Sequence, residues 1–196
     1  MVFVFIASAL VFAQTPAPLG TYTATTGSSM VKGRSAAIGE TGGLLKNKFK
    51  KPTEAGADNT ITISLLSYST KEEISQLKAA QGNPQQFMTT LSSFQHGTVT
   101  MGGKSFPVNM ASSNSRSGKF VITILSSKAL SSTGGQFMAG KGLSTGYIEL
   151  LVDAGGNGQG LLHASAQIAI DPQGEVSAKG GGSLSKATEL TSVSRQ

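Results

Sequence analysis

The sequence predicts one mainly β domain, an antiparallel β-sandwich or open barrel of seven to nine strands with two short helices on one face or end. Several segments alternate apolar and polar side chains with the period of two that a half-buried strand requires. Aromatic residues are only 6% of the 196-residue chain, tryptophan is absent, and serine, threonine and glycine are abundant, as is typical of strands and turns. Only residues 70–81 and 84–94 have helical spacing and helix-start signals.

The first residues of the chain resemble an export signal. An apolar run extends from Val2 to Ala13 with only Ser8 inside it, and Gln14-Thr-Pro-Ala-Pro18 follows. As a helix this run covers about 18 Å, well short of the ~30 Å hydrocarbon core of a bilayer. Secretory signals have an apolar centre of this length and small residues at the cleavage site. The alternative interpretation is a buried N-terminal strand, because the run is rich in valine, phenylalanine and isoleucine.

We therefore expect a signal peptide at residues 1–13, a spacer at 14–20 and a single domain at 21–196, with cleavage after Ala13 rather than Ala17. The chain contains no cysteine. A hydrophobic core must therefore hold the exported fold, while thiol catalysis, cysteine-ligated metals and lipid attachment through cysteine are excluded. No later run approaches the roughly 18 apolar residues of a membrane helix, so the mature chain is expected to be secreted or periplasmic without a transmembrane segment.

The chain is basic, with a net charge of +6, although only 13% of its residues are charged. Its one basic cluster contains Lys46, Lys48, Lys50 and Lys51, with Phe49 between them. Four charges attract phosphates only feebly at physiological salt, whereas lysines on an edge strand discourage edge-to-edge pairing. We interpret the cluster as a solvated loop or edge strand and expect no specific nucleic-acid partner.

The N-terminal part of the domain contains one clear strand. Residues 28–38 are expected to form one or two strands, and residues 39–58 a polar, lysine-rich loop or long hairpin. From Asn59 to Tyr68, isoleucine and leucine alternate with threonine and serine. This alternation predicts a strand with one buried face.

Two helices are predicted next. Thr70 and Glu73 fit a capping box, in which the hydroxyl and the carboxylate each bond a backbone N–H at the helix start, and Gly82 ends the helix. Asn83 and Pro84 then cap and open a second helix at a position where proline loses no hydrogen bond. Both helices have apolar stripes that are expected to dock on a sheet: Ile74, Leu77 and Ala80, then Phe87, Met88, Leu91 and Phe94.

The second half is expected to be antiparallel β structure. Residues 98–101 and 105–110 form a hairpin about Gly102-Gly103, and Pro107 favours a sheet edge for its second strand. In residues 161–170 the even positions are apolar, while His163, Ser165 and Gln167 lie on the other face, as in a strand with one wet side. The remaining strands are expected at residues 120–125, 147–152, 176–178 and 189–193.

A resemblance covers about residues 69–195. The order of the helix pair, the strand Tyr147-Ile-Glu-Leu-Leu-Val-Asp153, the loop Gly155-Gly-Asn-Gly-Gln-Gly160, the strand Ala164 to Asp171 and the ending Leu190-Thr-Ser-Val193 resembles an uncharacterised family of small exported bacterial β-rich proteins. The matching motifs are turns and strands rather than chemical signatures. The resemblance implies export and a β-rich fold, and it brings no known activity.

The segment Gly156-Asn-Gly-Gln-Gly160 invites a phosphate-loop interpretation, because closely spaced glycines let backbone N–H groups approach an anion. The segment after it alternates as a strand, whereas a dinucleotide site needs a helix there. We interpret it as a hairpin loop and expect no cofactor. Asp153 and Asn157 also begin like a calcium loop, but Ala164 stands where a bidentate glutamate is needed, so weak calcium binding remains only an alternative.

The order of Ser75-Gln-Leu-Lys78, Ser112-Ser-Asn114 and Lys179-Gly-Gly181 imitates a penicillin-recognising serine enzyme, in which the lysine helps to activate the serine. Ser-x-x-Lys also occurs at Ser29–Lys32 and Ser183–Lys186, about as often as chance allows in a serine-rich chain. The third motif lacks its threonine. We therefore interpret the order as coincidental.

His96 and His163 are the only histidines, and neither has a second ligand at metal-binding spacing. His163 and Ser165 share a strand face but stand roughly 6.6 Å apart along it, beyond hydrogen-bond reach. Glu149 and Asp171 are placed either to meet across strands or to lie exposed at hairpin ends. No catalytic, cofactor-binding or metal-ligating residue is predicted.

These observations favour an exported non-enzymatic binding or cell-envelope protein. Its partner would be a protein, a glycan or a small apolar ligand held between the helix pair and the sheet. Two alternatives stay open: a small serine hydrolase that uses Ser75 or the His163 face, and a structural surface subunit that assembles edge to edge. The ligand and the oligomeric state are left open.

Overall fold

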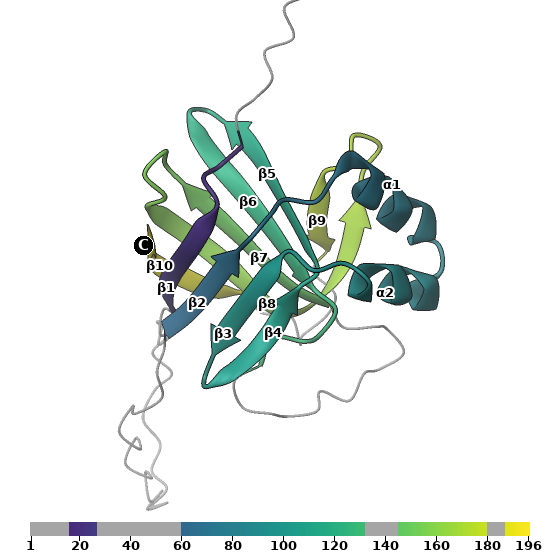
Figure 1. Cartoon of the computed structure of the whole chain (residues 1–196), viewed down its shortest axis with the longest axis horizontal. Coiled ribbons are helices and arrows are strands. Elements are labelled where there is room, and N and C mark those ends of the chain that lie inside the picture. Colours follow the sequence, from purple (N-terminus) through teal and green to yellow (C-terminus); the bar gives the residue numbers. More distant parts are fainter. Residues whose placement is uncertain (1–15, 27–59, 132–144, 180–186) are drawn as a thin grey trace, which may run out of the picture.

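The computed structural model describes residues 16–26, 60–131, 145–179 and 187–196, which form ten strands and two helices (Figure 1). The expected class, mainly antiparallel β with two short helices, is confirmed, with one strand more than the predicted range. In chain order the elements are β1 (Gly20–Thr26), β2 (Thr60–Leu65), α1 (Lys71–Ala80), α2 (Pro84–Ser92), β3 (Gly97–Met101), β4 (Lys104–Val108), β5 (Met110–Arg116), β6 (Lys119–Ser126), β7 (Thr145–Val152), β8 (Gly158–Ile170), β9 (Val176–Lys179) and β10 (Thr188–Arg195).

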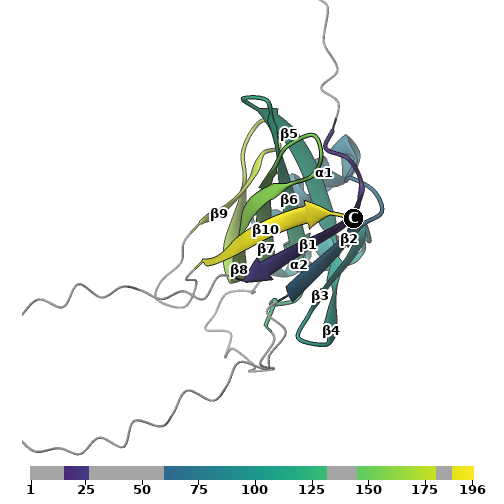
Figure 2. The ribbon, with the colours of Figure 1, turned by 90° about the vertical axis from the view of Figure 1, so that its left-hand side faces the viewer.

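The strands form one curled antiparallel sheet of order β4-β3-β2-β1-β10-β8-β7-β6-β5, and β9 pairs with the end of β8. The edge strands β4 and β5 are consecutive in the chain, and the sheet curls so that these edges approach each other (Figures 1 and 2). The result is a nearly closed barrel. The edge position that Pro107 predicts for its strand is confirmed, because β4 is the first strand of the sheet.

Two segments outside the strands cover the free edge of β5. Ser69 donates its backbone N–H to the carbonyl of Ala111 at 2.7 Å, and its Oγ accepts the N–H of Ala111 at 3.1 Å. Ala17 donates its N–H to Ser113 Oγ at 2.8 Å and is only 2% exposed. The residues before β1 and the connection from β2 to α1 therefore satisfy backbone and side-chain groups of an edge that would otherwise be open to pairing.

Alternation along the strands builds two apolar cores. One fills the barrel with fully buried side chains such as Ile63, Ile122, Ile148 and Leu150. The other lies outside the barrel, where the opposite face of β5 to β9 meets the helix pair. Its buried members are Leu77, Ala80, Phe87, Leu91, Met110, Leu125, Tyr147, Ala166, Ile170 and Val176. In Figure 2 the helices lie behind the sheet, on the far side from β1 and β10.

Both helix starts are confirmed in detail. Thr70 Oγ1 accepts the N–H of Glu73 at 3.2 Å, and Glu73 Oε2 accepts the N–H of Thr70 at 2.7 Å, which completes the capping box. Asn83 Oδ1 accepts the N–H groups of Gln85 and Gln86, each at 3.1 Å. The predicted stripes do dock on the sheet.

The prediction of one strand at residues 105–110 is wrong. These residues belong to two strands, β4 and β5, and β5 was not predicted. Asn109 makes the break: it is buried, donates Nδ2–H to the carbonyl of Phe94 at 2.8 Å, and accepts the N–H of Ser127 on Oδ1 at 2.8 Å. Most of β5 is serine, asparagine and arginine, so neither propensity nor alternation identifies it. It becomes a strand through antiparallel pairing with β6.

Smaller differences concern strand ends. The strand expected at residues 59–68 ends at Leu65, and β1 begins at Gly20, the last residue of the expected spacer. The signal peptide at 1–13, the strands at 28–38, the loop at 39–58 and the cluster Lys46 to Lys51 lie outside the described residues.

Candidate functional site

A groove of about 520 Å³ lies between α1, β5 and the turn that joins β8 to β9. Most of its lining residues have polar side chains, and they come from segments that are far apart in the sequence. The lining residues are Pro16, Tyr68, Ser69, Lys71, Ile74, Ser75, Lys78, Ser112, Ser113, Asn114, Pro172, Gln173, Gly174 and Glu175.

Each wall of the groove is fixed by packing or by hydrogen bonds. Leu77 anchors α1 in the second core, so the side chains of Ser75 and Lys78 lie on the exposed part of the helix. In the β8–β9 turn, Asp171 Oδ1 accepts the N–H groups of Gln173 at 2.9 Å and Glu175 at 2.8 Å. The groove is therefore preformed rather than assembled by mobile side chains.

The fold brings Ser75 and Lys78 together with Ser112 and Asn114 in this groove, although the sequence order was interpreted as coincidental. Ser75 Oγ donates to the carbonyl of Lys71 at 2.8 Å, and Lys78 Nζ donates to the carbonyl of Pro172 at 3.0 Å. A lysine serves as the base of a serine nucleophile where it is desolvated and aimed at the hydroxyl. Both side chains are exposed and hold other partners, which fits polar lining and not a catalytic pair.

Lys179, of the third serine-enzyme motif, ends β9, and Gly181 lies outside the described residues. Neither belongs to the described lining of the groove.

A second polar cluster joins Ser67, His96 and Glu73. Ser67 Oγ lies 2.8 Å from His96 Nδ1, and His96 Nε2 lies 3.3 Å from Glu73 Oε2. The 3.3 Å contact is within ion-pair distance but lacks hydrogen-bond alignment, so Nε2 has no hydrogen-bond partner among the described residues. Sequence reasoning missed this cluster because 29 positions separate Ser67 from His96. Only the capping box drew attention to Glu73.

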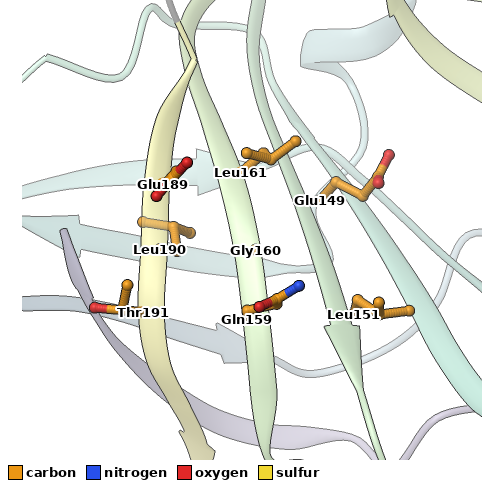
Figure 3. Close-up of a pocket in the computed structure, with 8 residues that line it drawn as sticks. All are labelled: Glu149, Leu151, Gln159, Gly160, Leu161, Glu189, Leu190 and Thr191. Atoms are coloured by element: carbon orange, nitrogen blue, oxygen red, sulfur yellow. The ribbon is translucent and has the colours of Figure 1, made fainter. Parts of the chain in front are cut away.

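A smaller depression of about 310 Å³ lies on the outer face of β7, β8 and β10. Figure 3 shows Glu149 and Glu189 on either side of Leu161, as their cross-strand register requires. Glu149 is held by Tyr147, whose hydroxyl donates to Oε2 at 2.6 Å. Glu149 and Asp171 do not meet, because Glu149 pairs with Leu161 whereas Asp171 lies beyond the far end of β8.

His163 packs against Tyr147 from the neighbouring strand. The ring centroids are 5.7 Å apart in an edge-to-face arrangement with an interplanar angle of 71°. His163 Nδ1 is buried and has no hydrogen-bond partner among the described residues. The geometry gives His163 a packing contact with Tyr147.

The glycine-rich segment is only partly the expected hairpin loop, because β8 begins at Gly158, three residues before the strand expected at residue 161. Asp153 Oδ1 accepts the N–H of Asn157 at 2.9 Å, and Gly156 has a φ of +83° that favours glycine. The Asp153 carboxylate thus holds the loop itself. Among the described residues no group of three or more histidine, aspartate or glutamate side chains is placed to hold a metal ion.

The three tyrosines provide a test of the packing. Burial raises the pKa of Tyr22, Tyr68 and Tyr147 above the ordinary 10.0, and beside Tyr147 the Glu149 carboxylate raises it further. A raised phenol pKa means that the unfolded chain loses protons first, so stability present below pH 10 should fall as the pH rises above it. We expect the native protein to develop little tyrosinate absorbance at pH 10, where the urea-unfolded chain is half titrated. A native titration centred near pH 10 would contradict this packing.

No helix among the described residues is long and apolar enough to cross a membrane. Comparison of the chain with protein-family models, curated proteins and solved structures finds no match. The groove and the cluster of Ser67, His96 and Glu73 are therefore the features from which a function can be proposed.

Proposed function

We propose that this protein is an exported binding protein whose groove between α1, β5 and the β8–β9 turn takes a polar, negatively charged ligand, namely an acidic glycan. The observation that carries the proposal is the groove lining, which combines two lysines with hydroxyl and amide groups on three fixed segments. Such groups donate charge-assisted and neutral hydrogen bonds to carboxylates and sugar hydroxyls.

The charge of the lining supports an anionic ligand. Lys71 and Lys78 face the groove, and among the described lining residues Glu175 is the single acidic one. Tyr68 adds an aromatic side chain of the kind that packs on sugar rings. Ser112, Ser113 and Asn114 line the β5 side, opposite the helix that carries the lysines.

Export remains part of the proposal. The buried Ala17, bonded through its N–H to Ser113, favours cleavage upstream of it, after Ala13. Mass spectrometry of protein from its own compartment should give a mature chain that begins at Gln14. A chain that begins at Pro18 would lack a core residue and would contradict this assignment.

A binding titration tests the groove. With oligogalacturonate as the probe, Lys78→Ala is expected to weaken binding about 10-fold, because one hydrogen bond to a charged group contributes about 1.5 kcal/mol. Lys104→Ala, on the β4 edge away from the groove, is the matched control and should bind like the wild type. A neutral galacto-oligosaccharide should bind more weakly than the acidic probe. Equal affinity of both variants, or no binding, would overturn the proposal.

A further inference from the structure

The cluster Ser67, His96 and Glu73 lies outside the proposed groove and has the parts of a nucleophilic site. Ser67 Oγ lies within hydrogen-bond distance of an imidazole whose other nitrogen faces a carboxylate, at 2.8 and 3.3 Å. A nucleophile, a base within reach of it and a third group that orients the base are the parts from which activated hydroxyls are built. We propose that Ser67, His96 and Glu73 form a relay that makes the Ser67 hydroxyl a nucleophile toward esters.

Hydrogen-bond chemistry sets the direction of this relay. An ionised carboxylate only accepts hydrogen bonds, so the imidazole nitrogen that faces Glu73, Nε2, carries the hydrogen of the neutral ring. Nδ1 is then the acceptor, and the hydroxyl of Ser67 donates to it. A serine-hydrolase triad has the same order of donors and acceptors, but there Nε2 faces the serine and Nδ1 faces the acid, whereas here Nδ1 faces Ser67 and Nε2 faces Glu73. The loose alignment at Nε2 resembles unliganded enzymes, in which such contacts tighten when the substrate binds.

The backbone holds each member in place. Glu73 Oε2 also accepts the N–H of Thr70 at 2.7 Å, which fixes the carboxylate at the start of α1. His96 donates its backbone N–H to Val108 at 2.7 Å and accepts that of Leu66 at 2.8 Å, and its side chain is buried. The imidazole is therefore positioned with little freedom to rotate away.

The nucleophile remains within reach of solvent. Ser67 is half-buried, in contrast to the 5% exposure of His96. Its neighbour Leu66 is 70% exposed, the most exposed large apolar residue in the described part of the chain. An apolar surface beside an activated hydroxyl suits an ester with a short hydrocarbon acyl chain.

The reaction balances with water as the only co-reactant. Ser67 Oγ bonds to the acyl carbon while its proton moves to His96 Nδ1. The alcohol leaves with that proton as the bond between the acyl carbon and the alcohol oxygen breaks. Water then attacks the acyl carbon and gives a proton to His96 Nδ1. The bond between the acyl carbon and Ser67 Oγ breaks as that proton passes to Ser67 Oγ, and the carboxylic acid is released. Glu73 stays ionised and acts as a positioning residue.

The test is covalent labelling of the folded full chain with an alkyl fluorophosphonate, followed by intact-mass and peptide analysis. We expect one adduct on Ser67, none in Ser67→Ala, and wild-type labelling in the control Ser64→Ala, which removes a hydroxyl on β2. Glu73→Gln should slow labelling about 100-fold, because the imidazole that acts as the general base then loses the carboxylate that orients it. In the proton NMR spectrum, a far-downfield imidazole N–H resonance should appear in the labelled wild type, where the contact between Nε2 and Glu73 has tightened, and should be absent from labelled Glu73→Gln.

The labelling results distinguish a reactive Ser67 from a Ser67 whose hydrogen bond to His96 is only structural. No adduct on Ser67 in the folded wild type, or equal labelling of the urea-unfolded chain, would overturn the proposal. If Ser67 of the Glu73→Gln variant reacted at the wild-type rate, Glu73 would not take part in the relay and the proposal would be overturned. The decisive measurement is made on the wild-type protein, so no variant of the buried His96 is needed. Labelling of Ser67 is also independent of ligand binding in the groove, so the two proposals can fail separately.

Discussion

Replacement of Gly97 by alanine should destabilise the protein by at least about 3 kcal/mol, among the largest effects of any single change. Gly97 opens β3 with a φ of +153°, and an added Cβ would lie 1.9 Å from the carbonyl oxygen of Ser64 and 3.2 Å from Leu65 Cα. Both neighbours are backbone of the adjacent strand β2, so neither yields without loss of pairing. The midpoint of urea unfolding measures the effect.

Gly82→Ala is the matched control. Gly82 has no atom within 4 Å of an added Cβ, and it follows α1, so alanine there is expected to leave the midpoint nearly unchanged. Equal midpoints for Gly97→Ala and Gly82→Ala would show that β2 and β3 do not approach each other as closely as the fold requires.

The second large effect is expected for Leu77→Ala, at about 2–5 kcal/mol, the usual cost of a cavity left by leucine in a packed core. Leu77 is fully buried and holds α1 against the outer face of the sheet. Because the same helix carries Lys71, Ser75 and Lys78, the variant should also lose groove binding. Calorimetry and the oligogalacturonate titration measure the two effects.

Ala79→Ser, on the exposed side of α1, is the control for Leu77→Ala. It should change stability by less than about 0.5 kcal/mol and keep the ligand affinity. If Leu77→Ala lost less than about 1 kcal/mol, the helix pair would not be docked through this residue, and the groove would lack one of its walls.

The helices and the β3–β4 turn were predicted correctly because their signals lie within a few neighbouring residues. Thr70 and Glu73 cap α1, and Asn83 with Pro84 opens α2, through contacts that span three residues or fewer. The apolar stripes of both helices and the alternation in β2 record which face is buried, since that face repeats with the period of the element. The single buried face expected for residues 161–170 is wrong, because a register shift in β8 places Leu162 in the barrel core and Ala166 and Ile170 in the second core. The two glycines at positions 102 and 103 likewise identify the β3–β4 turn, where both have positive φ.

The candidate sites depend on contacts that leave no local pattern. The groove combines α1, β5 and the β8–β9 turn, and β5 itself is a strand only because β6 pairs with it. Ser67 and His96 meet because the connection after β2 runs beside the start of β3. No spacing rule relates two such residues, so sequence reasoning named His96 without finding a partner for it and did not consider Ser67.

The sequence by itself determined the mainly β class, the two capped helices and the alternating faces that build two cores. These features follow from interactions among near neighbours and from the burial of apolar side chains. The tertiary structure alone decided the strand order, the break at Asn109 and the meeting of Ser67, His96 and Glu73. These depend on which edges pair across long separations, a choice set by the packing of the whole sheet and not by any one segment.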